Sequence, residues 1–99
     1  MNILKKQEGT KLTIALEGRL DTTTAPSLES ELFEVIDGLT ELIFDIGKLD
    51  YISSAGLRVL LSAQKKMNRQ GSMIVRHSSS DILEIFEVTG FTDILTLED

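Results

Sequence analysis

The stretch from Glu41 to Leu60, ELIFDIGKLDYISSAGLRVL, changes from a strand pattern to a helix pattern. Its first part, residues 41–46, is an almost continuous apolar run with little alternation. A short run of this kind is typical of a strand that is covered on both faces inside a parallel sheet. Apolar residues then recur at helical spacing from about Ala55 to Arg69, before Gly71. The stretch therefore predicts a central strand followed directly by a helix.

The residues before this stretch predict a hairpin and a helix. Residues 11–17, KLTIALE, alternate between apolar and other side chains, which is typical of a half-buried strand. A shorter strand around residues 2–6 is expected to pair with it across a turn at Glu8-Gly9-Thr10. A helix is expected from about Ala25 to Asp37, with Thr24 as its cap and Pro26 in its first turn. The apolar stripe of that helix is expected to contain Ala25, Leu28, Leu32, Phe33 and Ile36.

The residues after it continue the alternation. Residues 72–76 predict a short strand, and residues 80–89 predict a third helix that stops at Gly90. A short final element is expected to close the core with Phe91, Ile94, Leu95 and Leu97. The chain thus predicts one α/β domain over residues 1–99, with a mixed, largely parallel sheet of four to five strands. Right-handed crossovers and three to four helices complete the expected architecture.

Composition excludes several classes of protein. The chain has 99 residues, 41% hydrophobic and 26% charged, which fits one globular domain rather than a disordered chain. The net charge of −6 predicts no nucleic-acid partner, because an acidic domain is repelled by phosphates. No apolar run approaches the ~20 residues of a membrane span, so no membrane insertion is expected. The opening residues, MNILKKQEG, are charged where a signal peptide is apolar, and we expect a cytoplasmic protein.

Catalytic motifs are missing from the sequence. With no cysteine and a single histidine, His77, the chain lacks thiolate chemistry and paired-histidine metal sites. It has no G-x-S-x-G turn, no Walker lysine motif and no G-x-G-x-x-G. His77 is expected to be an exposed residue at the end of a strand. We therefore expect no catalytic residue, no cofactor and no metal, and a protein that is not an enzyme.

Two loops are the candidate functional segments. The first is GRLDTTTA at residues 18–25, and the second is DYISSAGLR at residues 50–58. Both connect an expected strand to a helix, so in a parallel sheet they lie side by side at the edge where ligands gather. From the residues alone, Ser54 is first of all a helix cap. The bare first turn, Ala55-Gly56, would also accept an anion, including a phosphate on the serine itself, and would let a partner's backbone approach closely.

The two longer expected helices carry opposite charges. The second helix contains Arg58, Lys65, Lys66 and Arg69 and no acidic residue. The first contains Glu29, Glu31, Glu34 and Asp37 and no basic residue. These are either two solvated faces or a dipolar surface that orients a protein partner.

The sequence resembles the STAS domain, specifically the bacterial anti-sigma factor antagonists. The resemblance is carried by GRLDTTTA, by LDYISSAGLRVL and by the late IFEVTGF segment, and it covers essentially the whole chain. It implies a protein without catalysis that switches partners. An unphosphorylated antagonist binds an anti-sigma factor that is also a serine kinase, and so frees the sigma factor. The kinase then phosphorylates the antagonist and is released, and a serine phosphatase resets the switch.

The resemblance also implies roles for particular residues. The acceptor serine of the family stands two residues before a Gly-Leu pair, which here is Ser54. An acidic residue usually precedes the acceptor, whereas this chain has Ser53, which becomes a competing acceptor. Asp21 matches the family's Gly-x-Leu-Asp and is expected to lie beside Ser54. The expected partner-binding residues are Asp21, Thr22, Thr23, Ser53, Ser54, Ala55, Gly56 and Arg58.

Two other functions fit the same sequence. The chain could be a STAS docking subunit of a transport or signalling assembly, in which Ser54 is merely structural. A small enzyme that uses Asp21 and Ser54 is a distant third, because the sequence supplies no base for it.

Overall fold

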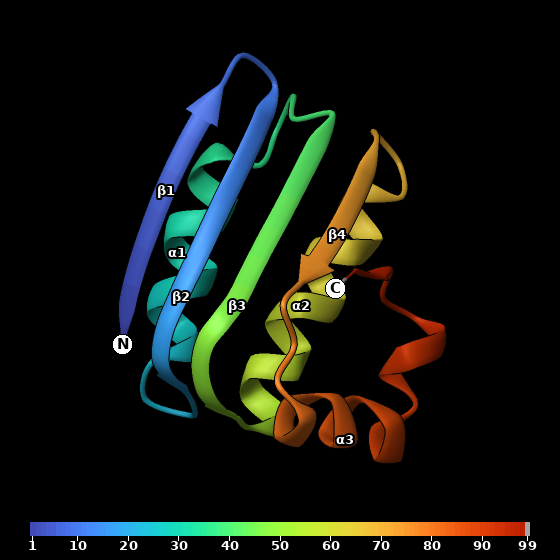
Figure 1. The fold of residues 1–99 in the computed structure, drawn as a ribbon. Coiled ribbons are helices and arrows are strands. Elements are labelled where there is room, and N and C mark those ends of the chain that lie inside the picture. The colour runs from blue at the N-terminus through green and yellow to red at the C-terminus, as the bar shows by residue number, and fades with distance from the viewer. Residues whose placement is uncertain (99) are drawn as a thin grey trace.

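Five strands form one sheet in the computed structural model, which describes residues 1–98 (Figure 1). The strands lie in the order β1-β2-β3-β4-β5. Only β1 (Asn2–Glu8) and β2 (Lys11–Leu20) are antiparallel, and they are joined across Gly9-Thr10 as a hairpin. The strands β3 (Glu41–Ile52), β4 (Ser72–Arg76) and β5 (Leu97–Glu98) extend the sheet in parallel. The prediction of a mixed, largely parallel sheet is confirmed.

The two central strands are longer than the sequence predicts. We expected them to end at residues 17 and 46, whereas β2 continues to Leu20 and β3 to Ile52. Polar residues interrupt the apolar pattern in both extensions, which hides them from sequence analysis. The pairing passes two register shifts, between Ala15 and Glu17 and between Gly18 and Arg19, and then resumes as far as Leu20 opposite Ile52. These irregular extensions carry both candidate loops to the same end of the sheet.

Helices α1 (Ala25–Val35) and α2 (Ser54–Met67) cover one face of the sheet, behind it in Figure 1. The predicted burial of β3 on both faces is nevertheless confirmed, because the neighbouring residues Ile43 and Phe44 point to opposite faces and are both buried. Phe44 points into the helix-covered core and is fully buried. Ile43 lies outside that core cluster and is buried on the other side, between Thr13 of β2 and Ile74 of β4. An apolar strand interior thus arises here with helices on one face only.

The helix ends depart slightly from the predicted bounds. Helix α1 ends at Val35 rather than at Asp37, because the chain turns after Ile36 and buries Leu39. The amide of Leu39 donates to the carbonyl of Ile36 at 3.2 Å, and Gly38 takes a φ of 86° between them. Helix α2 begins at Ser54, one residue earlier than expected, and ends at Met67, two residues earlier than expected. Helix α3 spans Ser80–Thr89, as predicted.

Two predicted core residues lie at the surface. Phe33 of α1 is 38% exposed, because Leu28 and Leu32 already take the inward positions of the helix. Ile94, which follows the short 3-10 helix Phe91–Asp93, is 41% exposed. Leu95 is buried as expected. Within residues 1–98 no helix is long and apolar enough to cross a membrane.

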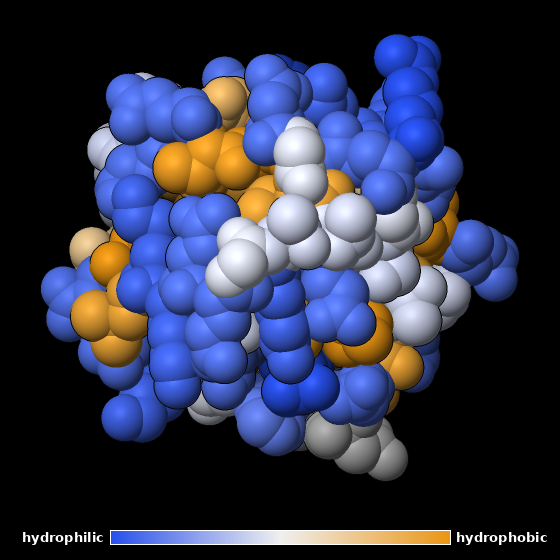
Figure 2. Space-filling model, turned by 90° about the horizontal axis from the view of Figure 1, so that it is seen from above, coloured by the Kyte–Doolittle hydropathy of each residue, from blue (hydrophilic) through white to orange (hydrophobic). Residues whose placement is uncertain are grey.

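The end of the molecule that carries the β1–β2 turn is mainly hydrophilic. Figure 2 views the protein from this end, and hydrophobic residues form separate patches there between hydrophilic and neutral ones. The starts of α2 and α3 lie at the other end, below the sheet in Figure 1. The candidate loops therefore lie opposite the face seen in Figure 2.

Candidate functional site

A backbone hydrogen bond joins the two candidate loops. Leu20, the last residue of β2, is paired with Ile52, the last residue of β3. The amide of the next residue, Ser53, donates to the carbonyl of Leu20 at 2.9 Å. The chain then leaves β2 through Asp21 and leaves β3 through Ser54. The predicted meeting of the two loops at one edge of the sheet is confirmed.

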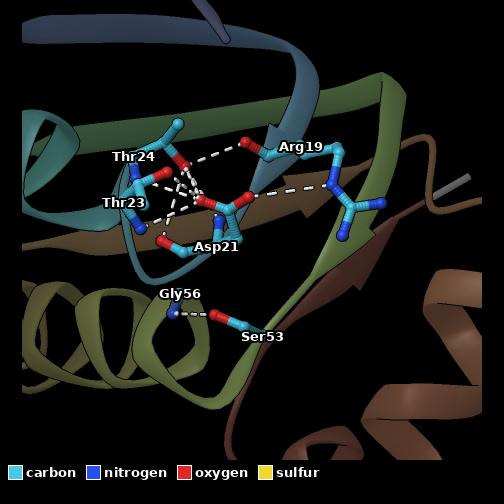
Figure 3. Close-up of polar contacts among 6 residues, drawn as sticks. All are labelled: Arg19, Asp21, Thr23, Thr24, Ser53 and Gly56. Atoms are coloured by element: carbon cyan, nitrogen blue, oxygen red, sulfur yellow. Dashed lines mark hydrogen bonds and ion pairs between the residues drawn. The ribbon is translucent and has the colours of Figure 1, made fainter.

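Asp21 organises the first loop. Its Oδ1 accepts hydrogen bonds from the amides of Thr23 and Thr24 at 3.0 and 3.1 Å, and from the Thr23 hydroxyl at 2.8 Å (Figure 3). The Thr23 hydroxyl is the main cause that lowers the pKa of Asp21 from 3.8 to about 2. Loss of hydration opposes it as the second-largest effect, and the two amides and the Thr24 hydroxyl lower the pKa further. Asp21 is therefore a carboxylate at neutral pH, held in one orientation beside the second loop.

Thr24 does not cap helix α1 with its side chain. It occupies the N-cap position, but its φ and ψ of −97° and −25° are helical. Its hydroxyl donates back to the carbonyl of Arg19 at 2.9 Å and accepts from the amide of Asp21 at 2.8 Å. The prediction that the Thr24 side chain caps the helix is therefore wrong. Its hydroxyl instead connects the loop to the end of β2.

The helix cap of α2 is Ser53, not Ser54. Ser53 has extended backbone angles, φ −96° and ψ 175°, and its Oγ accepts from the amide of Gly56 at 3.4 Å. Ser54 is the first helical residue and is exposed. The structure records no side-chain hydrogen bond from Ser54 to another residue of the range 1–98. The cap that we assigned to Ser54 therefore belongs to its neighbour, and the Ser54 hydroxyl is free to face solvent.

Gly56 packs against the core. A Cβ atom at this position would lie 2.7 Å from Cγ of Leu20 and 2.9 Å from Cγ1 of Ile52. The lack of a side chain thus lets α2 approach the ends of β2 and β3. Gly56 is buried, so it supports the shape of the surface from below. Sequence analysis gave its small size a different reason, the approach of a partner's backbone.

Four of the expected partner-binding residues lie at the surface around a shallow hollow. Thr22, Ala55 and Arg58 line a space of about 250 Å³ between the starts of α1 and α2, together with Pro26 and Glu29. Thr23 is exposed at the tip of the first loop. The two loops and the starts of the two helices therefore form one continuous surface.

Sequence analysis missed a pair of residues beside this surface. The Arg19 guanidinium lies over the ring of Tyr51, 4.4 Å from its centroid, and its Nε is 3.7 Å from Oδ2 of Asp21. Tyr51 is 38% exposed. The signal was present in the sequence, because Arg19 and Tyr51 lie within the two motifs, but only the register of β2 and β3 makes them partners. A cation stacked on an aromatic ring is thus placed next to the Asp21 carboxylate.

His77 belongs to another part of the molecule. It is exposed, as predicted, and follows β4 with a positive φ of 65°. Its Nδ1 lies 3.0 Å from Oδ1 of Asp45. Partial burial opposes ionisation of Asp45, but hydrogen bonds from the Gly47 amide and His77 outweigh it and lower the pKa of that carboxyl. Among residues 1–98, no group of three potential ligands is arranged to hold a metal ion.

Comparisons with known proteins agree on one family. The family model described as the STAS domain matches residues 2–99. An anti-sigma-B factor antagonist from Listeria monocytogenes is 30% identical over 105 aligned positions, which cover all of this chain and 91% of that protein. BtrV from Bordetella bronchiseptica is 39% identical over 85 residues, which cover 84% of this chain and 73% of BtrV.

The fold is also shared with solved structures. The unphosphorylated form of the anti-sigma factor antagonist SpoIIAA superposes with a TM-score of 0.80 at 17% identity, covering 99% of this chain and 88% of SpoIIAA. The phosphorylated form of the Bacillus protein SpoIIAA superposes with a TM-score of 0.78, covering 99% of this chain and 92% of that one. At these identities the likeness shows a common fold.

Proposed function

The chain belongs to the STAS domain family, and we propose that it is an anti-sigma factor antagonist switched off by phosphorylation of Ser54. In this proposal the unmodified protein binds an anti-sigma factor that is also a serine kinase. The kinase phosphorylates Ser54 and releases its product, and a serine phosphatase restores the binding form. The exchange takes place in the cytoplasm. The protein itself acts by binding, without catalysis.

The observation that carries this proposal is that two adjacent serines differ in burial and in hydrogen bonding. The hydroxyl of Ser53 accepts from the Gly56 amide and is half-buried, so a phosphate on it would remove the cap of α2. Ser54 is exposed at the first position of the helix. A kinase can therefore reach Ser54 without breaking a hydrogen bond of the folded protein, which favours it over Ser53 as the acceptor.

The position of Ser54 also suits a switch. A phosphate adds about −1.5 to −2 charges, and the start of a helix tolerates negative charge because its first amides and its dipole favour an anion. The same phosphate lies on the surface that carries the ionised Asp21 carboxylate. A partner that covers this surface would have to desolvate both charges, which is costly. Phosphorylation is thus expected to leave the fold intact and to weaken partner binding.

A second candidate is a docking subunit of a transport or signalling assembly. It uses the same surface, and it predicts that Ser54 is never modified. The remaining alternative, a small enzyme, has little support in the structure. The only histidine of the chain, His77, is hydrogen-bonded to Asp45 rather than to Ser54.

The decisive experiment combines binding with phosphate mapping. The purified protein is mixed with each purified serine-kinase anti-sigma factor of the same genome, with ATP, and modification is located by mass spectrometry. We expect one phosphate on the wild-type protein and on Ser53→Asn, which keeps a capping oxygen but offers no hydroxyl. We expect none on Ser54→Ala. Phosphate on Ser54→Ala, or binding without any phosphate, would overturn the switch at Ser54.

A further inference from the structure

A groove runs from the candidate site along the outer surface of α1 and α2. Its first part is the hollow of about 250 Å³ near Ala55 and Arg58. Its second part, about 490 Å³, is lined by Phe33 and Ser62. Pro26 and Glu29 line both parts, so the two hollows are continuous. We call this feature the interhelical groove.

Residues of both helices line the groove. Pro26, Glu29 and Phe33 line it from α1, and Ala55, Arg58 and Ser62 line it from α2. An ion pair also joins α2 to the turn after α1, in which Nζ of Lys66 lies 2.8 Å from Oδ1 of Asp37. At the near end, Glu29 and Arg58 are exposed, and neither forms an ion pair within residues 1–98. The hollow near Ala55 thus carries two charges of opposite sign that form no ion pair with each other or with another described residue.

The floor of the groove contains an unusual exposed side chain. Phe33 is 38% exposed although it is one of only four phenylalanines in the chain. Two small polar residues, Ser30 and Ser62, line the same hollow as its ring. An aromatic ring in a hollow, flanked by polar groups, is the usual form of an anchor position in a protein interface.

We propose that the interhelical groove receives an amphipathic segment of the anti-sigma factor, with Phe33 as its apolar anchor. The proposal rests on the proposed function and extends its surface beyond the two loops. Charge complementarity defines the segment. It presents an apolar side chain to Phe33, a carboxylate to Arg58, and a lysine or arginine to Glu29. Continuity with the Ser54 surface lets one partner occupy both, so that the groove holds the kinase while its active site reaches Ser54.

The test measures binding of the purified anti-sigma factor to variants of the full chain. Phe33→Ala is expected to raise Kd at least tenfold, with a melting temperature within a few degrees of the wild type. The matched control is Val88→Ala on α3, which also shortens an exposed apolar side chain, 77% exposed, but lies outside the groove. Its Kd is expected to stay within twofold. Equal Kd values for Phe33→Ala and the wild type would overturn the groove while leaving the switch at Ser54 standing.

A charge-reversal series separates a partner contact from an attraction between Glu29 and Arg58 themselves. Glu29→Lys and Arg58→Glu are each expected to raise Kd severalfold. The double variant keeps one charge of each sign at the two positions but exchanges them toward the partner, so it is expected to bind no better than either single variant. Recovery of wild-type affinity in the double variant would overturn the proposed orientation.

Two further results would be informative in the same series. If light scattering showed a wild-type dimer that Phe33→Ala dissolves, the occupant would be a second copy of the chain, and the proposal would be wrong. If the wild-type protein bound no anti-sigma factor, both the proposed function and this inference would fall. In phosphorylation assays, Phe33→Ala should raise KM for Ser54 modification and leave kcat unchanged, because Phe33 lines the second hollow and not the one near Ser54.

Discussion

The amide of Ser53 donates a 2.9 Å hydrogen bond to the carbonyl of Leu20. This bond continues the pairing of β2 with β3 by one residue beyond Ile52. Asp21 follows Leu20 and Ser54 follows Ser53. The bond therefore brings together two residues that are far apart in the chain. The candidate site is therefore part of the sheet's end, and its geometry depends on the register of two parallel strands.

The hydrophobic core of the domain depends on Phe44 of the central strand. Phe44→Ala is expected to lower the free energy of unfolding by roughly 3–5 kcal/mol, because the fully buried ring leaves a cavity in a small domain. Chemical denaturation measures the change. Phe33→Ala is the matched control, and its exposed ring predicts a much smaller cost. A loss well under 1 kcal/mol for Phe44→Ala would show that the strand is not central to the core.

Gly56 is expected to tolerate no methyl group. Alanine is normally the better helix former by about 1 kcal/mol, so Gly56→Ala would stabilise an unhindered helix. Here the new Cβ would lie under 3 Å from side-chain atoms of Leu20 and Ile52, and overpacking of this kind costs about 1–3 kcal/mol. We therefore expect net destabilisation in thermal melts. A raised melting temperature would mean that α2 does not approach the strand ends so closely.

The two serines are expected to differ in stability. Ser53→Ala removes the oxygen that accepts from the Gly56 amide and should cost about 1 kcal/mol. Ser54→Ala removes no recorded hydrogen bond and should change stability by less than about 0.5 kcal/mol. Denaturant unfolding of both variants checks the assignment. The reverse order of stabilities would return the cap to Ser54.

A negative charge at Ser54 is expected to affect binding rather than folding. Ser54→Asp should keep the circular dichroism spectrum and melt within a few degrees of the wild type, because a helix start favours an anion. It should lose measurable binding to the anti-sigma factor. Ser54→Asn is the uncharged control of similar size. Unfolding of Ser54→Asp would indicate a structural role for Ser54, and full binding would argue against a switch at this residue.

Asp21 makes the stability of the first loop depend on acid pH. Its pKa is lowered from 3.8 to about 2 in the folded protein, chiefly by the Thr23 hydroxyl. The stabilisation is complete above the unfolded pKa and is lost as the pH falls from about 4 to 2, because the unfolded state binds the proton first. Asp21→Asn should reduce this part of the pH dependence. NMR titration of the Asp21 carboxyl should give a value near 2, and an ordinary value would contradict the hydrogen bonds of the loop.

The sequence by itself determined the element order, the hairpin, the parallel sheet and the meeting of the two loops. These features follow from local patterns: alternation in residues 11–17, an apolar run at 41–46 and helical spacing after Ala55. Each pattern is a property of neighbouring residues, and strand–helix–strand order then restricts the topology. The family resemblance rested on three segments, GRLDTTTA, LDYISSAGLRVL and IFEVTGF.

Only the tertiary structure decided how the site is built. Ser53 is the helix cap because β3 continues to Ile52. This places Ser53, with extended backbone angles, at the turn into α2. Gly56 is needed because Leu20, distant in sequence, lies against it. Phe33 is exposed because Leu28 and Leu32 occupy the core-facing positions of α1. These outcomes depend on distances between residues far apart in the chain, and those distances are set by strand register and packing rather than by any local pattern.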